Sequence, residues 1–336
     1  MSEPVLVTGG SGFLGHHVVR DLVLRGARPR VLVRGTYEPQ LDDKASAIEL
    51  LRGDVVEDGE DMVPLARALD GCTQVYHQAG IVSRDPGSTA AMMRVHVEGT
   101  KRLLSAASRA GVRRVVVASS SGTVAVSRTA EPIATEESGY ATAIVAGWPY
   151  YLSKIYQEKV AFELGHSLGL EVVVVNPSIL FGPGDRRGSS TGDVLRFLRG
   201  EVPAVPSGGI NFVDARDAAV ATIEAMDRGR PGERYLLGGP NWTLREFFAR
   251  LGRVAHQRPP WLRLPDSWAR AGATVVEELY HQLDRKAPID RISVEMSQAF
   301  WYCDSSKAER ELGFDARDPA ETLDDTVRWL RRHHRI

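Results

Sequence analysis

The sequence VLVTGGSGFLG, residues 5–15, decides the fold of this 336-residue chain. Its first three residues, Val5 to Val7, form a short apolar run, and three spaced glycines follow. Beyond them, residues 16–26 carry apolar side chains at helical spacing. The stretch therefore predicts a buried strand, a tight glycine turn and a helix.

The three glycines suit a turn that holds a dinucleotide. Gly9 permits a sharp turn, Gly12 lets a ligand approach the backbone, and Gly15 allows the helix to pack close to the strand. A pyrophosphate would face the helix N-terminus, where free N–H groups and the helix dipole favour negative charge. The alternative is an ordinary glycine-rich loop, but the position between a strand and a helix favours the nucleotide. We expect Phe13 and Leu14, on the same turn, to contact the cofactor too.

The end of the second predicted strand bears on the choice of cofactor. This strand, Arg30 to Val33, ends at Arg34, where a site for NAD would usually place an acidic residue to bind the ribose 2′-hydroxyl. An arginine suits a 2′-phosphate, which it can grip with two parallel hydrogen bonds. We therefore predict that NADP(H) is preferred, with NAD(H) as the alternative if Arg34 is only a solvated residue at a strand end.

The composition is that of an ordinary globular protein, with 43% hydrophobic residues, 25% charged residues and a net charge of −1. Such a charge gives no long-range field that would attract nucleic acid or an anionic membrane. Cys72 and Cys303 are too few for a metal cluster, so we expect no metal site and a reducing, cytoplasmic location. No signal peptide is expected, and the nearest candidate for a membrane span, residues 261–283, contains five charged residues.

The order of the predicted elements indicates the fold class. Apolar, β-branched runs alternate with segments of helical spacing such as residues 97–110, which is typical of strands buried on both faces of a parallel sheet. The runs are Val5–Val7, Val31–Val33, Val75–His77, Val115–Ala118 and Val172–Val175. The sequence therefore predicts an α/β fold, a Rossmann-type doubly wound parallel sheet with a smaller, interleaved C-terminal substrate-binding lobe.

The domain organisation follows from where this alternation changes. We expect residues 1–177 to form the dinucleotide-binding domain, with returning segments near residues 205–225. Residues 178–336 would form mainly the substrate-binding cap, in which residues 261–300 are expected to be helical.

A tyrosine and a lysine form the candidate catalytic pair. Tyr150 and Lys154 are four residues apart in a predicted helix, residues 150–165, so both project from one face. A nearby ammonium stabilises a phenolate, so we expect Lys154 to lower the pKa of Tyr150. Tyr151 competes with Tyr150 but would point to a different face. The segment Ala118-Ser119-Ser120-Ser121-Gly122-Thr123 places hydroxyl groups at the carboxyl edge of the sheet, where one could hold a substrate oxygen.

These motifs together resemble the extended short-chain dehydrogenase/reductase family, also called the NAD-dependent epimerase/dehydratase superfamily. The glycine turn is similar to the family motif TGxxGxxG, and Tyr150 to Lys154 is similar to its YxxxK motif. Further segments resemble family landmarks: residues 53–55, 75–80, 176–178, 212–217 and 306–313. Val31 to Arg34 and Ser119 to Val124 look most like the branch of dihydroflavonol reductases and 3β-hydroxysteroid dehydrogenases.

The resemblance implies a role for each matching residue. Tyr150 would donate a proton to a carbonyl that receives hydride from the nicotinamide, and Lys154 would also bind the nicotinamide ribose. The serine that holds the carbonyl oxygen would be Ser120 by similarity to the reductases or Ser121 by similarity to the sugar epimerases, with a narrow preference for Ser121. The remaining cofactor contacts implied by the resemblance are Asp54 and Val55 at the adenine, Ala79 and Gly80 at a strand end, and Pro177 and Ser178 near the nicotinamide. One departure is His96, which stands where many relatives have asparagine, and we expect it to be structural.

Three functions remain open at this point. The first is NADPH-dependent reduction of a ketone or aldehyde in a fairly apolar small molecule, by an enzyme that binds neither nucleic acid nor membrane and can form a homodimer. The second is a nucleotide-sugar epimerase or dehydratase, for which basic residues of the cap would hold the diphosphate: Arg186, Arg187, Arg196 and Arg199. The third is a dinucleotide-binding protein without turnover, which the presence of Tyr150 and Lys154 disfavours.

Overall fold

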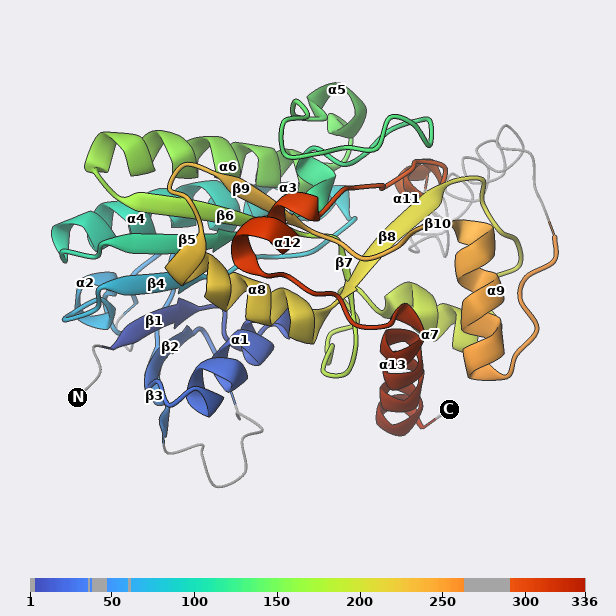
Figure 1. The fold of residues 1–336 in the computed structure, drawn as a ribbon. Helices are drawn as coiled ribbons and strands as arrows, with labels where there is room; N and C mark the ends of the chain where they lie inside the picture. The colour runs from blue at the N-terminus through green and yellow to red at the C-terminus, as the bar shows by residue number, and fades with distance from the viewer. Residues whose placement is uncertain (1–3, 36, 38–46, 60–61, 263–290, 336) are drawn as a thin grey trace.

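A seven-stranded parallel sheet forms the centre of the molecule, with strand order β3-β2-β1-β4-β5-β6-β9 (Figure 1). The computed structural model describes residues 4–35, 37, 47–59, 62–262 and 291–335. The strands are β1 (Val5–Thr8), β2 (Pro29–Val33), β3 (Glu49–Arg52), β4 (Gln74–His77), β5 (Arg114–Ala118), β6 (Glu171–Pro177) and β9 (Arg234–Leu237). The order reverses between β1 and β4, which is where such sheets bind nucleotides.

Helices cover both faces of this sheet, as the doubly wound prediction requires. Helices α1 (Phe13–Leu24) and α8 (Ala215–Arg228) pack on one face, and α4 (Gly99–Arg109) and α6 (Pro149–Leu168) pack on the other (Figure 1). The valines of β5 alternate between the two resulting cores: Val116 faces α1 and α8, whereas Val115 and Val117 face α4 and α6. Burial on both faces explains why these strands are continuous apolar runs.

A smaller sheet, of order β10-β8-β7, lies beside the large one. Its strands are β7 (Ile179–Phe181), β8 (Gly209–Asp214) and β10 (Asn241–Thr243), and it packs with α7 (Gly192–Leu198), α9 (Leu244–Ala255) and α13 (Pro319–His334). The chain crosses between the two parts: α8 packs against α1, β9 joins the large sheet, and α12 (Ser306–Leu312) packs on α8.

The remaining elements are short and connect the main ones. They are α2 (Leu65–Ala68), the 3₁₀ turns η2 (Pro86–Ser88) and η4 (Ser121–Thr123), α3 (Thr89–Met93), the π-helical segment η3 (Arg94–Glu98), α5 (Thr142–Val145) and α11 (Arg291–Ser297). Within the described ranges, no helix is long and apolar enough to cross a membrane.

The prediction of a helical cap over residues 261–300 is wrong at both ends of that range. Residue 262 forms an isolated bridge with Ala204, and Phe300 pairs with Ser127 and Gly209. Both end residues pair with distant segments, and local helical spacing does not specify such long-range pairing. Helix is present in α11, while residues 263–290 lie outside the described residues.

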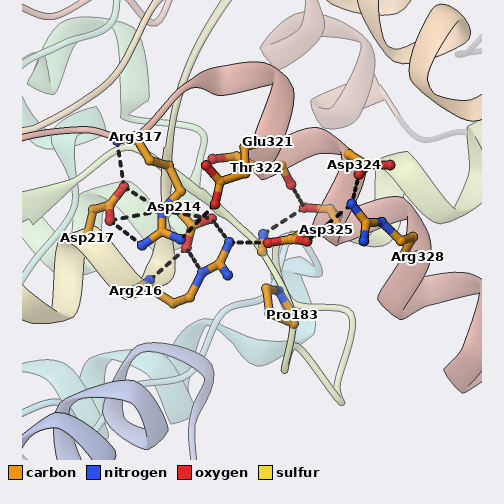
Figure 2. Close-up of polar contacts among 12 residues, drawn as sticks. Pro183, Asp214, Arg216, Asp217, Arg317, Glu321, Thr322, Asp324, Asp325 and Arg328 are labelled. Atoms are coloured by element: carbon orange, nitrogen blue, oxygen red, sulfur yellow. Dashed lines mark hydrogen bonds and ion pairs between the residues drawn. The ribbon is translucent and has the colours of Figure 1, made fainter.

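A cluster of arginine and aspartate side chains ties the two parts together (Figure 2). Arg216, on α8, bonds Asp214 through both Nε and Nη2 and donates to Asp325 of α13 over 2.7 Å. Arg317, just before α13, donates through Nη2 to Oδ1 of Asp217 on α8 and through Nε to its Oδ2. Two charge-assisted contacts thus hold the start of α8 against the C-terminal helix.

We predict that Arg317→Met lowers the free energy of unfolding by about 2 kcal/mol, because it leaves the Asp217 carboxylate without its bidentate partner. Arg328→Met is the matched control, since Arg328 pairs with Asp324 on the surface and its side chain is 60% exposed. We expect the control to change stability by less than about 0.5 kcal/mol. If urea unfolding shows that both variants lose the same free energy of unfolding, this account is contradicted.

Candidate active site

The glycine turn between β1 and α1 is packed too closely for side chains. Gly9 has φ +69°, and a Cβ there would lie 2.5 Å from the backbone nitrogen of Ala79 at the end of β4. A Cβ on Gly15 would clash with the carbonyl oxygen of Gly9. The glycines therefore let the first turn of α1, which begins at Phe13 and Leu14, approach both β1 and the end of β4.

Two features of this edge fit a bound dinucleotide. A Cβ on Gly12 would meet only the Gly9 carbonyl oxygen, at 3.2 Å, so the N-terminus of α1 is open to a ligand. Beside the turn, both polar atoms of the Gln78 side-chain amide are buried and have no hydrogen-bond partner among the described residues. Free backbone N–H groups and an unpaired amide at one strand edge match the phosphates and polar groups of such a cofactor.

The residues expected at the adenosine end lie together. Arg34 follows β2, its side chain is 56% exposed, and its Nε lies 3.9 Å from the carboxylate of Asp54. The other Asp54 oxygen accepts a hydrogen bond from the backbone N–H of Val56. Val55 is buried against Gly99 of α4, where a Cβ would lie 2.8 Å from Val55. The guanidinium thus stands at the end of β2 with its donors accessible.

Tyr150 and Lys154 both lie at the start of α6, facing the sheet. The Lys154 ammonium donates to the carbonyl oxygen of Ala118 and to Oε1 of Gln157, each over 2.9 Å. Burial lowers the pKa of Lys154 to about 8. The expected lowering of the Tyr150 pKa is not found: burial, and the neighbouring Tyr151, raise it, while a hydrogen bond with Ser120 opposes the rise. Tyr150 is therefore protonated at neutral pH.

The serine turn separates the two candidate hydroxyl groups. The Ser120 side chain is close enough to Tyr150 to oppose the rise of the Tyr150 pKa, and its Oγ accepts a hydrogen bond from the backbone N–H of Gly122. Ser121 begins the turn η4, and it is only 4% exposed. Of the two serines, Ser120 is therefore the one whose side chain influences Tyr150.

The residues expected near the nicotinamide lie at the ends of β4 and β6. A Cβ on Gly80 would lie 3.6 Å from the Lys154 ammonium, so Gly80 and its neighbour Ala79 line the approach to Lys154. Pro177 ends β6, and the single proton of the Ser178 hydroxyl faces two acceptors, Oδ1 of Asn211 at 2.5 Å and the carbonyl oxygen of Leu237 at 3.0 Å.

His96 is buried beside Tyr150 and Lys154, and it bonds the backbone of Ile81 and the side chain of Ser153. Its Nε2 accepts from the backbone N–H of Ile81 over 3.0 Å, so its Nδ1 carries the proton and donates to Ser153 over 2.8 Å. Ser153 in turn donates to the Tyr150 carbonyl oxygen. Burial, and then the charge of Lys154, hold the pKa of His96 well below its usual value.

A chain of buried hydrogen bonds joins the glycine turn to Lys154. Thr8 donates to Nδ1 of His77 over 2.8 Å, and Nε2 of His77 donates to the Thr100 hydroxyl over 2.9 Å. The same hydroxyl accepts from Gln157, whose oxygen accepts from Lys154. Thr100 can accept twice because its own proton goes to the His96 carbonyl oxygen.

The sequence motifs did not single out Gln157, Thr100 or His77 as members of the site. Each is a single polar residue in an otherwise ordinary element, so no local pattern marks it as buried. The available signal was helical spacing, since Gln157 lies three residues after Lys154 on the same face of α6.

Comparison with known proteins identifies the family. Residues 5–238 match the model of the NAD dependent epimerase/dehydratase family. A putative dihydroflavonol 4-reductase of Synechocystis sp. is 32% identical over 99% of this chain and 96% of its own length. Sterol demethylase protein B of Methylococcus capsulatus is 32% identical over 98% of this chain and 99% of its own. The crystal structure of gox2253 is 33% identical, has a TM-score of 0.84 and covers both chains completely. The chain therefore belongs to the NAD dependent epimerase/dehydratase family, the extended short-chain dehydrogenases/reductases.

We predict that Thr100→Val lowers the free energy of unfolding by about 2–4 kcal/mol, because it leaves the buried donors of His77 and Gln157 unpaired. Thr222→Val is the matched control: Thr222 is also fully buried in a helix, and its hydroxyl donates to Ala218 four residues earlier. We expect the control to lose about 1 kcal/mol or less. If chemical denaturation shows the same loss of unfolding free energy for both variants, the chain of hydrogen bonds through Thr100 does not stabilise the fold.

Proposed function

We propose that this enzyme uses NADPH to reduce the carbonyl group of a fairly apolar small molecule to an alcohol. The observation that carries the proposal is the meeting of Tyr150, Ser120 and Lys154 beside the glycine turn. The protonated hydroxyl of Tyr150, the hydroxyl of Ser120 and the ammonium of Lys154 lie at the edge of the sheet where the nicotinamide would bind.

The residues of the site supply the proton and the orientation. When bound, NADPH supplies the hydride that the carbonyl carbon receives. The Tyr150 hydroxyl transfers its proton to the carbonyl oxygen, and the Ser120 hydroxyl holds this oxygen in place, so that an alcohol results. Lys154, one helical turn after Tyr150, would bind the nicotinamide ribose and supplies a positive charge to the site. We assign the oxygen-holding role to Ser120 rather than Ser121, because Ser120 is the serine whose side chain influences Tyr150.

Aromatic side chains beside Tyr150 support an apolar substrate. The ring of Tyr151 lies 5.0 Å from that of Tyr150 and 4.8 Å from that of Trp301, measured between centroids. Trp148 stacks beside Trp301 at 5.5 Å. Trp148 and Trp301 are buried in one hydrophobic cluster, so this group gives Tyr150 apolar surroundings. The names of two full-length relatives, a putative dihydroflavonol reductase and a sterol demethylase protein, point to substrates of this kind.

We expect Tyr150→Phe to lower the rate of carbonyl reduction by about 10²–10⁴-fold, because the proton donor is lost. The measurement is NADPH oxidation over a panel of aromatic, alicyclic and β-keto carbonyl compounds. Tyr156→Phe, an exposed tyrosine on the same helix, should keep full activity. Reduction that survives in Tyr150→Phe would rule out the proposed donor. If no compound is reduced and a UDP- or dTDP-sugar raises the melting temperature, the epimerase or dehydratase alternative replaces this proposal.

Arg34→Ala tests the preference for NADPH. A charge-assisted hydrogen bond to the 2′-phosphate contributes about 1.5–3 kcal/mol, so we expect the Kd for NADPH to rise by about 10-fold or more while that for NADH changes little. The control is Arg310→Ala, an exposed arginine on α12. An unchanged ratio of the two dissociation constants, measured by cofactor fluorescence, would refute the assignment.

A further inference from the structure

A buried carboxylate lies behind the catalytic residues. Glu158 is on α6, four residues after Lys154, and its side chain is 0% exposed. Residues four apart on a helix share one face, so Glu158 and Lys154 both point towards the sheet. Burying a charge is costly unless it is paired and hydrogen-bonded, so the surroundings of this carboxylate need an explanation.

One carboxylate oxygen holds the serine turn from two sides. Oε1 of Glu158 accepts from the Ser119 hydroxyl over 2.5 Å and from Nδ2 of Asn176 over 2.7 Å. Nδ2 of Asn176 has two protons, so its second proton is shared between the carbonyl oxygen of Ser120, at 3.0 Å, and the Thr123 hydroxyl, at 3.1 Å. Ser119 and Asn176 thus donate to one oxygen of Glu158, while the Arg234 guanidinium forms an ion pair with the other. The carboxylate fixes the segment that contains Ser120.

Glu158 and Lys154 bond consecutive residues at the end of β5. The Lys154 ammonium donates to the carbonyl oxygen of Ala118, and the next residue, Ser119, donates to Glu158. The ammonium of Lys154 and the carboxylate of Glu158 therefore contact adjacent residues, Ala118 and Ser119. Coulomb interactions are strong in such a buried region. Burial lowers the pKa of Lys154 to about 8, and the charge of Glu158 opposes this fall.

Other charged or titratable groups face the two residues from neighbouring elements. Arg234, on β9, places Nη1 3.4 Å from Oε2 of Glu158, and its guanidinium lies over the ring of Tyr140 at 4.4 Å. His77 and His96 lie beside Lys154, and burial lowers the pKa of both, so they are neutral at pH 7. Glu158 is thus the acidic group that supports the Lys154 charge.

We propose that Glu158 is a positioning residue of the active site: its carboxylate fixes the serine turn, and its negative charge stabilises the Lys154 ammonium. This inference rests on the proposed roles of Tyr150, Ser120 and Lys154. It adds a residue that touches neither substrate nor cofactor and acts through Ser119, Asn176 and Lys154.

The test is the titration of Lys154 in the free protein, followed by NMR of ¹³Cε-labelled lysine. The chain has six lysines, so the spectrum is simple, and Lys154→Arg assigns the signal. Glu158→Gln keeps the shape of the side chain and removes its charge, so we expect the midpoint for Lys154 to fall by about one pH unit or more. Glu163→Gln removes a charge from an exposed position on the same helix and should leave the midpoint unchanged. A midpoint for Glu158→Gln equal to that of the wild type overturns the proposal.

A second variant keeps the proposal testable if Glu158→Gln does not fold. Arg234→Met removes the positive charge that partly cancels the charge of Glu158. The carboxylate then stabilises the Lys154 ammonium more strongly, so the midpoint of the Lys154 titration should rise. An unchanged or lower midpoint contradicts the proposal. Because the titration needs no substrate, its outcome is independent of whether the panel of carbonyl compounds reveals a reductase.

Discussion

The arrangement of the site depends on the buried hydrogen-bond chain from Thr8 to Lys154. It runs through His77, Thr100 and Gln157, so it connects β1, β4, α4 and α6. Each member has a defined donor or acceptor role, because the Thr100 proton is committed to the His96 carbonyl oxygen. In a low-dielectric interior, a fully satisfied network of this kind specifies one geometry. The glycine turn and the lysine are therefore held in register although about 140 residues separate them.

The strands of the large sheet that could be predicted from the sequence are those buried on both faces. Continuous valine runs mark β5 and β6, and the structure places them at the centre with helices on either side. Strand β3 was missed because Glu49 to Arg52 lies at the edge of the sheet, half exposed, and has no apolar run. Strand β9 was missed because only four residues, Arg234 to Leu237, form it, and its place beside β6 is set by long-range pairing.

The motifs in the sequence predicted the contents of the site better than its electrostatics. The spacing of Tyr150 and Lys154 placed both on one helix, as found, but the pattern suggested that the lysine would lower the tyrosine pKa. In the structure, burial dominates, and the pKa of Tyr150 is raised. Burial and the direction of the Lys154 ammonium, towards Ala118 and Gln157, are properties of the packed fold, so a local pattern cannot specify them.

A local sequence pattern also cannot reveal the residues that support the site. Glu158 is in helix α6, and Asn176 is in strand β6. Only the folded chain brings these two side chains together beside the serine turn. Their burial depends on how α6 packs against β6. The resemblance to a family suggested which residues form the site, while the tertiary structure shows which side chains contact them.

The most direct test of the central claim is to follow deuterium from NADPH labelled at C4 of the nicotinamide, using mass spectrometry of the product. When the transferred hydrogen at C4 is the deuterium, net reduction by this site predicts one deuterium on the new carbinol carbon for each NADP⁺ formed. Product that contains no deuterium with either C4 epimer of the labelled cofactor, or a product that forms without net oxidation of NADPH, would contradict the account.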